Sequence, residues 1–321
     1  MVSDLQAVYR PAEAELTAVN EEMCRAVNTL TPFFQEAALS FIQAGGKRLR
    51  PLLTILAAKL GQMKTPQVVQ VAAALELVHL GSLVHDDVID ESLWRRGKPS
   101  VNAAYGNRVA VLLGDFYFAR SLDLARQVGV DAVKVISDVI SSLVEGELEQ
   151  LQRSYDISIT EQEYWDRVRR KTASFIAECC RLGALYSPGN PVDPEELHAY
   201  GMNLGLAYQV VDDLLDFTSD KQTIGKPTNH DLRDGIITLP VIHALRVHPR
   251  REELAALIKS RRDFDLNMVL QCMHEAGSLA FAEQRVAELI AHAKTSLKGA
   301  PEHEAKAALL AIADFVLTRV S

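Results

Sequence analysis

The chain has 321 residues, of which 48% are hydrophobic and 24% charged, and its formal net charge is −8. This is the composition of a globular protein with room for one large core or two modest ones, and its acidity argues against nucleic acid as a main partner. The spacing of the four cysteines fits neither a zinc site nor a disulfide framework, and we find no signal segment and no uninterrupted apolar run of about 18 residues. We therefore expect a cytoplasmic protein with reduced thiols.

Helical periodicity dominates the chain, and the alternating pattern of strands is scarce. The expected helices span 5–30, 32–43, 51–61, 66–90, 108–127, 131–153, 161–186 and 194–218, and more helix follows from 236 onward. A basic glycine loop precedes the third helix, and a loop rich in Gly, Lys and Asp at 219–235 is expected to be mobile. No low-complexity linker divides the chain, so the sequence predicts one all-α domain over residues 1–321.

Three aspartates end the long apolar helix expected over 66–90, in the segment Asp86-Asp87-Val88-Ile89-Asp90. Asp86 and Asp90 are four residues apart, so both carboxylates project from one face, with Asp87 beside them. Like charges this close destabilise a helix unless a cation neutralises them. Alone, the segment fits either a solvated acidic helix end or a platform for a hard cation such as Mg²⁺.

The same arrangement recurs in Asp212-Asp213-Leu214-Leu215-Asp216, again at the end of an apolar helix. Acids on a solvated helix face would alternate with Lys or Arg. The aspartates of the two motifs instead lie at the ends of apolar helices that should be buried. Burying six carboxylates without compensation is prohibitive, so we expect divalent cations at both motifs.

Basic residues at several places in the chain predict that it binds anions. Mg²⁺ takes part of its coordination from phosphate oxygens, while Arg grips phosphate through a fixed fork and Lys acts as a point charge. Singly, each of these residues is most simply a solvent-exposed cation, but together they suggest one or two diphosphate-bearing substrates. They are Lys47, Arg50, Arg95, Arg96, Lys171 and Lys226.

These motifs, in this order, resemble those of the trans-polyprenyl (E-isoprenoid) diphosphate synthases over essentially the whole chain. The matching segments are Gly45-Gly46-Lys47-Arg48-Leu49-Arg50-Pro51, the first aspartate motif with Arg95-Arg96-Gly97, Gly146-Glu147-Leu148-Glu149-Gln150, Lys171-Thr172, and Gln209 with the second aspartate motif. The resemblance implies an isoprenoid-synthase-type helical bundle around a central apolar cavity, and a prenyltransferase activity.

The resemblance also implies a mechanism. An allylic diphosphate, farnesyl or geranyl, would be held between the two motifs by three Mg²⁺ ions, which stabilise charge as pyrophosphate leaves. Isopentenyl diphosphate would attack the allylic cation, and the pyrophosphate would take up the released proton. A homodimer, and transient membrane contact through a long product, are implied as well.

The residue roles follow from motif position. The implied metal ligands are Asp86, Asp87, Asp90, Asp212, Asp213 and Asp216. Arg95, Lys171 and Lys226 would hold the allylic diphosphate, with Thr172 and Gln209 near the cation, whereas Lys47, Arg50, His79 and Arg96 would hold isopentenyl diphosphate. A lone His on an apolar helix is more often a core residue, but His79 lies two turns before Asp86 on nearly the same face. Ile236 stands where the family often has a second lysine in the loop that closes the site.

Product length should depend on what blocks the apolar tunnel below the first motif. Short-chain members place a bulky aromatic residue four or five positions before the first aspartate, where this chain has Ser82 and Gly81. The next turns carry Leu77, Val78, Ala74 and Ala73, and Ile140 and Val144 are candidates for the floor. Gly81 could instead serve close helix packing. We expect a medium or long product of eight to four isoprene units, with octaprenyl diphosphate favoured.

The alternatives are a shorter-chain geranylgeranyl or farnesyl diphosphate synthase, a terpene cyclase and a non-catalytic partner subunit. A cyclase would usually have an Asn/Asp–Ser/Thr–Glu pattern in place of the second motif and would need no second diphosphate site. A non-catalytic subunit tends to lose one aspartate motif, and both are complete here.

Overall fold

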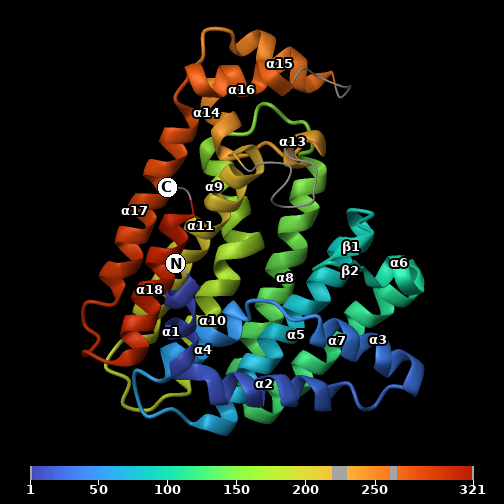
Figure 1. Cartoon of the computed structure of the whole chain (residues 1–321), viewed down its shortest axis with the longest axis vertical. Coiled ribbons are helices and arrows are strands. Elements are labelled where there is room, and N and C mark those ends of the chain that lie inside the picture. Colours follow the sequence, from blue (N-terminus) through green and yellow to red (C-terminus); the bar gives the residue numbers. More distant parts are fainter. Residues whose placement is uncertain (1, 219–229, 261–265, 320–321) are drawn as a thin grey trace. The chain divides into compact units, whose positions relative to one another are not determined.

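The computed structural model describes residues 2–218, 230–260 and 266–319, and it is 78% helical (Figure 1). Its described strands are β1 (Trp94–Arg95) and β2 (Lys98–Pro99), which pair antiparallel in a short hairpin. The predicted all-α fold is therefore confirmed.

The helices follow one another with short connections. The N-terminal series is α1 (Val2–Tyr9), η1 (Arg10–Ala12), α2 (Glu13–Ala26), α3 (Pro32–Gln43), α4 (Leu49–Ala58), α5 (Thr65–Ile89), α6 (Val101–Tyr105), α7 (Asn107–Val128) and α8 (Val130–Gln152). The C-terminal series is α9 (Glu161–Val168), η2 (Arg169–Ala173), α10 (Ser174–Leu185), α11 (Pro194–Thr218), α13 (His230–Arg233), α14 (Leu239–Val247), α15 (Arg251–Lys259), α16 (Leu266–Glu275), α17 (Ser278–Ser296) and α18 (Glu304–Thr318).

Contacts divide the chain into two compact units. Unit 1 comprises residues 1–141, 176–198 and 297–310, and unit 2 comprises residues 142–175, 199–296 and 311–321. Each aspartate motif thus belongs to its own unit, the first to unit 1 and the second to unit 2. The expectation of one domain stays a prediction.

Unit 1 is built on α5, which contacts α2, α4 and α7. By length and composition α5 could cross a membrane, but 72% of its most apolar window is buried inside the protein, as in a core helix. Two glycines let α5 and α7 approach closely: a Cβ added at Gly114 would collide with the His85 ring, and one at Gly81 would lie 2.9 Å from the Phe118 ring. Buried Tyr117 of α7 donates a hydrogen bond to the Ala38 carbonyl (2.9 Å).

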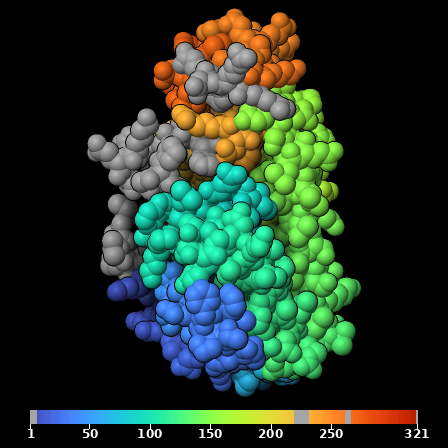
Figure 2. Space-filling view, turned by 90° about the vertical axis from the view of Figure 1, so that its right-hand side faces the viewer, coloured from blue at the N-terminus to red at the C-terminus, as the bar shows by residue number. Residues whose placement is uncertain are grey.

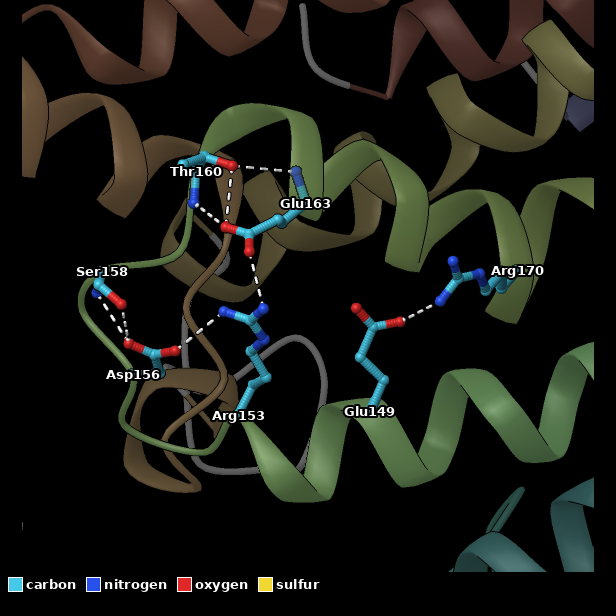
Figure 3. Close-up of polar contacts among 7 residues, drawn as sticks. All are labelled: Glu149, Arg153, Asp156, Ser158, Thr160, Glu163 and Arg170. Carbon is cyan, nitrogen blue, oxygen red and sulfur yellow. Dashed lines mark hydrogen bonds and ion pairs between the residues drawn. The ribbon is translucent and has the colours of Figure 1, made fainter.

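Unit 2 shows how local sequence starts a helix, at α9. Thr160 accepts from the Glu163 amide while the Glu163 carboxylate accepts from the Thr160 amide (2.8 Å), a capping box that satisfies two backbone donors (Figure 3). Arg153, just beyond α8, bonds Glu163 (2.7 Å) and Asp156 (3.1 Å). The end of α8 is thereby tied to the start of α9.

Two expected helices are interrupted. The helix expected over 5–30 contains the 3₁₀ segment η1, because Pro11 has no amide hydrogen for an α-helical bond. The helix expected over 161–186 contains the π-helical segment η2. A π segment adds one residue to a turn, which the apolar periodicity of a sequence does not reveal.

Candidate active site

The three aspartates of the first motif differ in burial at the end of α5. Asp86 is half-buried and Asp90 exposed, whereas Asp87 is fully buried. Asp87 Oδ1 accepts from Arg95 Nε at 2.9 Å, and its Oδ2 is buried without a hydrogen-bond partner. The middle aspartate therefore anchors Arg95, and the first and last are less buried.

The hairpin β1–β2 places Arg95 and Arg96 beside this motif. Arg96 and Gly97 turn the chain with φ of 53° and 75°. Asn102 fastens the base of the hairpin by donating to the backbone carbonyls of Asp87 (3.0 Å) and Ser92 (3.1 Å). The base of the hairpin that carries both arginines is therefore fixed by the Asn102 side chain.

The glycine loop before α4 is held by a buried ion pair. Arg48, in a left-handed conformation at φ 46°, places Nη1 2.8 Å from Glu76 Oε1 of α5. Gly46, at φ 138°, leaves space for a neighbour, since a Cβ there would lie 2.8 Å from the Arg96 guanidinium carbon. Arg96 also donates to the Gly45 carbonyl. Arg48 thus fixes the glycine loop, and the loop leaves room at Gly46 for the Arg96 side chain.

Several arginines of unit 1 lie near His79 and affect its pKa. Its pKa is held well below the usual value, first by burial and then by the positive charges of Arg50 and Arg96, with further contributions from Arg48 and Arg95. His79 is therefore neutral at physiological pH. The expected anion-binding residues Arg50, His79 and Arg96 come together here, while Lys47 is exposed on the same loop.

In the second motif, at the end of α11, the middle aspartate is again the most buried. Asp212 and Asp216 are half-buried, and Asp212 Oδ1 lies 3.0 Å from Arg319 Nη1. Asp213 is buried and accepts from the Tyr164 hydroxyl (2.7 Å) and from Gln209 Nε2 (2.9 Å). The middle aspartate is again bound within the protein.

A further carboxylate, Asp231 on α13, belongs to this cluster and was missed in the sequence. Its backbone amide donates to Asp216 Oδ2 (3.2 Å). Burial, with the charges of Asp213 and Asp216, raises the pKa of Asp231 to about 7, and burial raises that of Asp213 to about 6. The segment His230-Asp231-Leu232-Arg233 has no i, i+4 acidic pair, so only the fold associates Asp231 with the motif.

The π-helical segment η2 presents the expected Lys171-Thr172 pair. Lys171 pairs with Glu147 of α8, and the neighbouring Arg170 places Nη1 2.6 Å from Glu149 Oε2 (Figure 3). Gly146 permits this approach of α8, because a Cβ there would lie 3.2 Å from the Lys171 backbone nitrogen.

Thr172 reaches the second motif through Gln209. The Thr172 hydroxyl donates to Gln209 Oε1 at 2.8 Å, and Gln209 Nε2 donates to Asp213. Thr172, Gln209 and Asp213 thus form one hydrogen-bonded chain.

The residues present suit a hard divalent cation that is shared with a ligand. The donors are carboxylate oxygens, and Asp87 Oδ2 is buried without a partner. Among the described residues no three His, Cys, Asp or Glu side chains converge as a ready metal cage. A cation at either motif would therefore complete its shell with water and phosphate oxygens, as Mg²⁺ does.

The expected chain-length residues lie on α5. Ala73, Ala74, Leu77 and Val78 are fully buried, and half-buried Ser82 donates to the His79 carbonyl (2.9 Å). The space expected to be open at Gly81 is occupied by Phe118 of α7. Ile140 is half-buried and Val144 is 49% exposed. Lys226 lies outside the described residues.

Known proteins are similar to this chain in sequence and fold. The model of the polyprenyl synthetase family matches residues 31–276. The chain is 37% identical to heptaprenyl diphosphate synthase component 2 of Geobacillus stearothermophilus, over 97% of this chain and 98% of the relative. It is 32% identical to octaprenyl diphosphate synthase of Escherichia coli, over 98% and 99% of the two chains. A Caulobacter crescentus polyprenyl synthase, crystallised with calcium and isoprenyl diphosphate, is 33% identical with a TM-score of 0.90, over 99% and 98% of the chains.

Proposed function

The chain belongs to the polyprenyl synthetase family, and from this premise we propose that it condenses isopentenyl diphosphate with an allylic diphosphate to make a medium- or long-chain all-trans polyprenyl diphosphate, octaprenyl diphosphate being favoured. Relatives of the same length carry heptaprenyl and octaprenyl synthase names. Farnesyl or geranyl diphosphate is the expected primer, and Mg²⁺ the expected metal.

The observation that carries the proposal is the group of fixed arginines beside the first motif. Arg95 is held by Asp87, Arg48 by Glu76 and Arg96 by the Gly45 carbonyl, and the charges of Arg50 and Arg96 act on His79. Such a group of arginines suits a diphosphate, which accepts bidentate bonds. We propose that Lys47, Arg50, His79 and Arg96 hold isopentenyl diphosphate.

Binding of the allylic diphosphate requires side chains that hold it and cations that neutralise its negative charge. We propose that Arg95, Lys171 and Lys226 bind it, and that the less buried carboxylates of Asp86, Asp90, Asp212 and Asp216 hold Mg²⁺, with Asp87 and Asp213 in support. Bound Mg²⁺ supplies stabilisation of the negative charge that grows on the diphosphate as the carbon–oxygen bond breaks.

The hydrogen-bonded series of Thr172, Gln209 and Asp213 is suited to stabilise the allylic carbocation. The Thr172 hydroxyl donates to the Gln209 amide oxygen, so the dipoles of these two side chains are set before ionisation. Preorganised dipoles need no rearrangement when charge develops. The double bond of isopentenyl diphosphate then attacks the allylic carbon, and the lost proton passes to the departing pyrophosphate, so no side-chain base is required.

The test is elongation by purified protein with labelled isopentenyl diphosphate, Mg²⁺ and farnesyl or geranyl diphosphate, with products sized by chromatography. A ladder of prenyl diphosphates ending near eight units is expected. No elongation with either primer would contradict the proposal. Activity that arises only when a second, different subunit is added would favour a heteromeric synthase, to which the name of the Geobacillus relative points.

We further propose that the chain forms a homodimer through α8. Val144, Leu148 and Leu151 lie four and three residues apart on this helix and are 49%, 60% and 52% exposed. Figure 2 shows α8, in green, at the molecular surface. An apolar stripe at this spacing suits helix–helix packing, and a two-fold axis would cover it with its own copy.

A further inference from the structure

Tyr155 has a backbone conformation that a bulky residue seldom adopts. It lies in the connection between α8 and α9, with φ at 61°. A left-handed φ is unfavourable for a large side chain, and it persists only where the surrounding structure holds it, as functional sites often do. The contacts of Tyr155 therefore indicate what this conformation serves.

Tyr155 fastens the turn that follows α13. Its backbone amide donates to the Gly235 carbonyl (2.8 Å), and its hydroxyl donates to the Arg233 carbonyl (2.6 Å). Its ring lies against the Gly235 α-carbon, because a Cβ added there would be 2.5 Å from Cδ2 of the ring. One residue thus contacts the turn through its amide, its hydroxyl and its ring.

The loop that carries Tyr155 is itself fixed. An ion pair between Arg153 and Asp156 (3.1 Å) spans the position of Tyr155, and Arg153 also bonds Glu163 at the start of α9 (Figure 3). The Asp156 carboxylate accepts from the Ser158 amide at 2.9 Å. Tyr155 therefore holds the turn from a firm base.

The turn, residues 231–236, is closed by its own backbone. The Ile236 amide donates to the Asp231 carbonyl (2.8 Å). The Gly235 amide donates to the Leu232 carbonyl (3.2 Å), with Gly235 at φ 80°. These are the two bonds of a Schellman motif, which ends a helix at a glycine. Asp231 is therefore tied to the part of the turn that Tyr155 contacts.

The other end of this turn reaches the second aspartate motif. The Asp231 amide donates to Asp216 Oδ2 (3.2 Å), and Tyr155, Asp231 and Asp216 all belong to unit 2. A donor on one oxygen of a carboxylate sets the direction in which the other oxygen points, and such outer partners strongly affect metal affinity.

We propose that Tyr155 is a positioning residue for the second aspartate motif: by holding the 231–236 turn it keeps the Asp231 amide on Asp216, and so orients the Asp216 carboxylate for Mg²⁺. This inference rests on the proposed function through the metal-binding role of Asp216. It requires no contact of Tyr155 with substrate or metal.

The experiment measures Mg²⁺ binding in the presence of inorganic pyrophosphate by isothermal titration calorimetry, and hence without turnover. Tyr155→Gly removes the ring and the hydroxyl, while glycine accepts the left-handed φ without strain. It should weaken Mg²⁺ binding by about tenfold, the low end of what loss of an outer partner costs a metal site. Tyr155→Phe, which loses only the hydroxyl, should weaken it by less. Wild-type affinity in Tyr155→Gly would overturn the inference.

The variants should still fold, because the chain just beyond the turn has a second anchor. Buried Arg167 donates through Nη2 to the Ile237 carbonyl at 2.8 Å. Tyr117→Phe is the matched control, since it also removes a tyrosine hydroxyl that donates to a backbone carbonyl, that of Ala38 (2.9 Å), but within unit 1. It should lower the urea midpoint and leave Mg²⁺ affinity unchanged. A loss of Mg²⁺ affinity equal to that of Tyr155→Phe would reduce the effect to general stability and overturn the positioning role.

A second comparison tests the route through Asp216. In an Asp216→Asn background, Tyr155→Gly should weaken Mg²⁺ binding by clearly less than it does in the wild type, because the carboxylate that it orients is gone. Equal fold-changes in the two backgrounds would contradict an action through Asp216.

Failure of this inference differs from failure of the proposed function. A wild type that elongates the primer, with Tyr155 variants that bind Mg²⁺ normally, overturns the role of Tyr155 alone. A wild type that makes no product, with Mg²⁺ binding still weakened in Tyr155→Gly, overturns the proposed function alone.

Discussion

Arg48 and Glu76 form an ion pair inside unit 1, with side chains only 10% and 2% exposed and Nη1 2.8 Å from Oε1. The pair joins the glycine loop to α5, since Arg48 also donates to the Ile42 carbonyl just before the loop. Its worth lies in geometry more than in net stability, because burying two charges costs about as much as their attraction returns.

Breaking this pair should be costly. Glu76→Ala leaves the Arg48 charge buried without a carboxylate, and we expect the free energy of unfolding to fall by about 3–5 kcal/mol. Urea denaturation followed by circular dichroism measures it. Glu253→Ala, which removes an exposed partner of Arg250, is the control and should show at most a small change. Equal effects of the two substitutions would mean that the Arg48–Glu76 pair is not buried in solution.

Substituting the less buried Asp86 and the buried Asp87 of the first motif should have different effects. Asp86→Asn should lower turnover by about 100-fold or more while leaving stability unchanged, because it removes a carboxylate proposed to hold metal. Asp87→Asn should lower the free energy of unfolding by about 1.5–3 kcal/mol, because Arg95 loses its charged acceptor. Steady-state kinetics and urea titrations on both variants measure the difference. Near-normal turnover of Asp86→Asn would refute the metal assignment.

Stability should depend on pH through Asp231. Its pKa is raised to about 7 by burial and by the neighbouring aspartates, so the native protein binds a proton that the unfolded chain releases near pH 4. This contribution to stability is complete below pH 4 and is lost as the pH rises through 7. Asp231→Asn should therefore stabilise the metal-free protein by about 1–2 kcal/mol at pH 8 and have little effect at pH 5. A stabilisation that does not change with pH would show that charge is not the cause.

The proposed dimer can be tested on α8. Leu148→Glu places a charge in the middle of the apolar stripe, and the mass measured by light scattering should fall from that of two chains to that of one. Val247→Glu is the control, because Val247 is 50% exposed on α14, away from the stripe in the sequence. A wild type that is monomeric at micromolar concentration would contradict the homodimer.

Sequence reasoning recovered the elements that local rules determine. The placement of Asp86 and Asp90 on one face required only helical geometry, and α3, α5, α7, α8 and α11 lie within one or two residues of their expected bounds. The same geometry could have indicated the burial of Asp87, because it lies about 100° around the helix from Asp86.

Features that depend on distant contacts were not predictable. The Arg48–Glu76 pair joins residues 28 positions apart, and the Phe118 ring reaches Gly81 from another helix. Asp231 joins the second motif only through the backbone contact of its amide with Asp216. Each depends on tertiary packing, which periodicity and spacing within one helix do not contain.

The π segment between α9 and α10 has a consequence for sequence change. One extra residue within a continuous helical path shifts the phase of everything after it by about 100°. Lys171 therefore meets Glu147 while Cys179 and Cys180 of α10 keep their buried positions. Deleting any one of residues 169–173 would restore ordinary periodicity and exchange the buried side of α10 for a polar one. For stability, substitutions in this segment should therefore be tolerated far more readily than a change in its length.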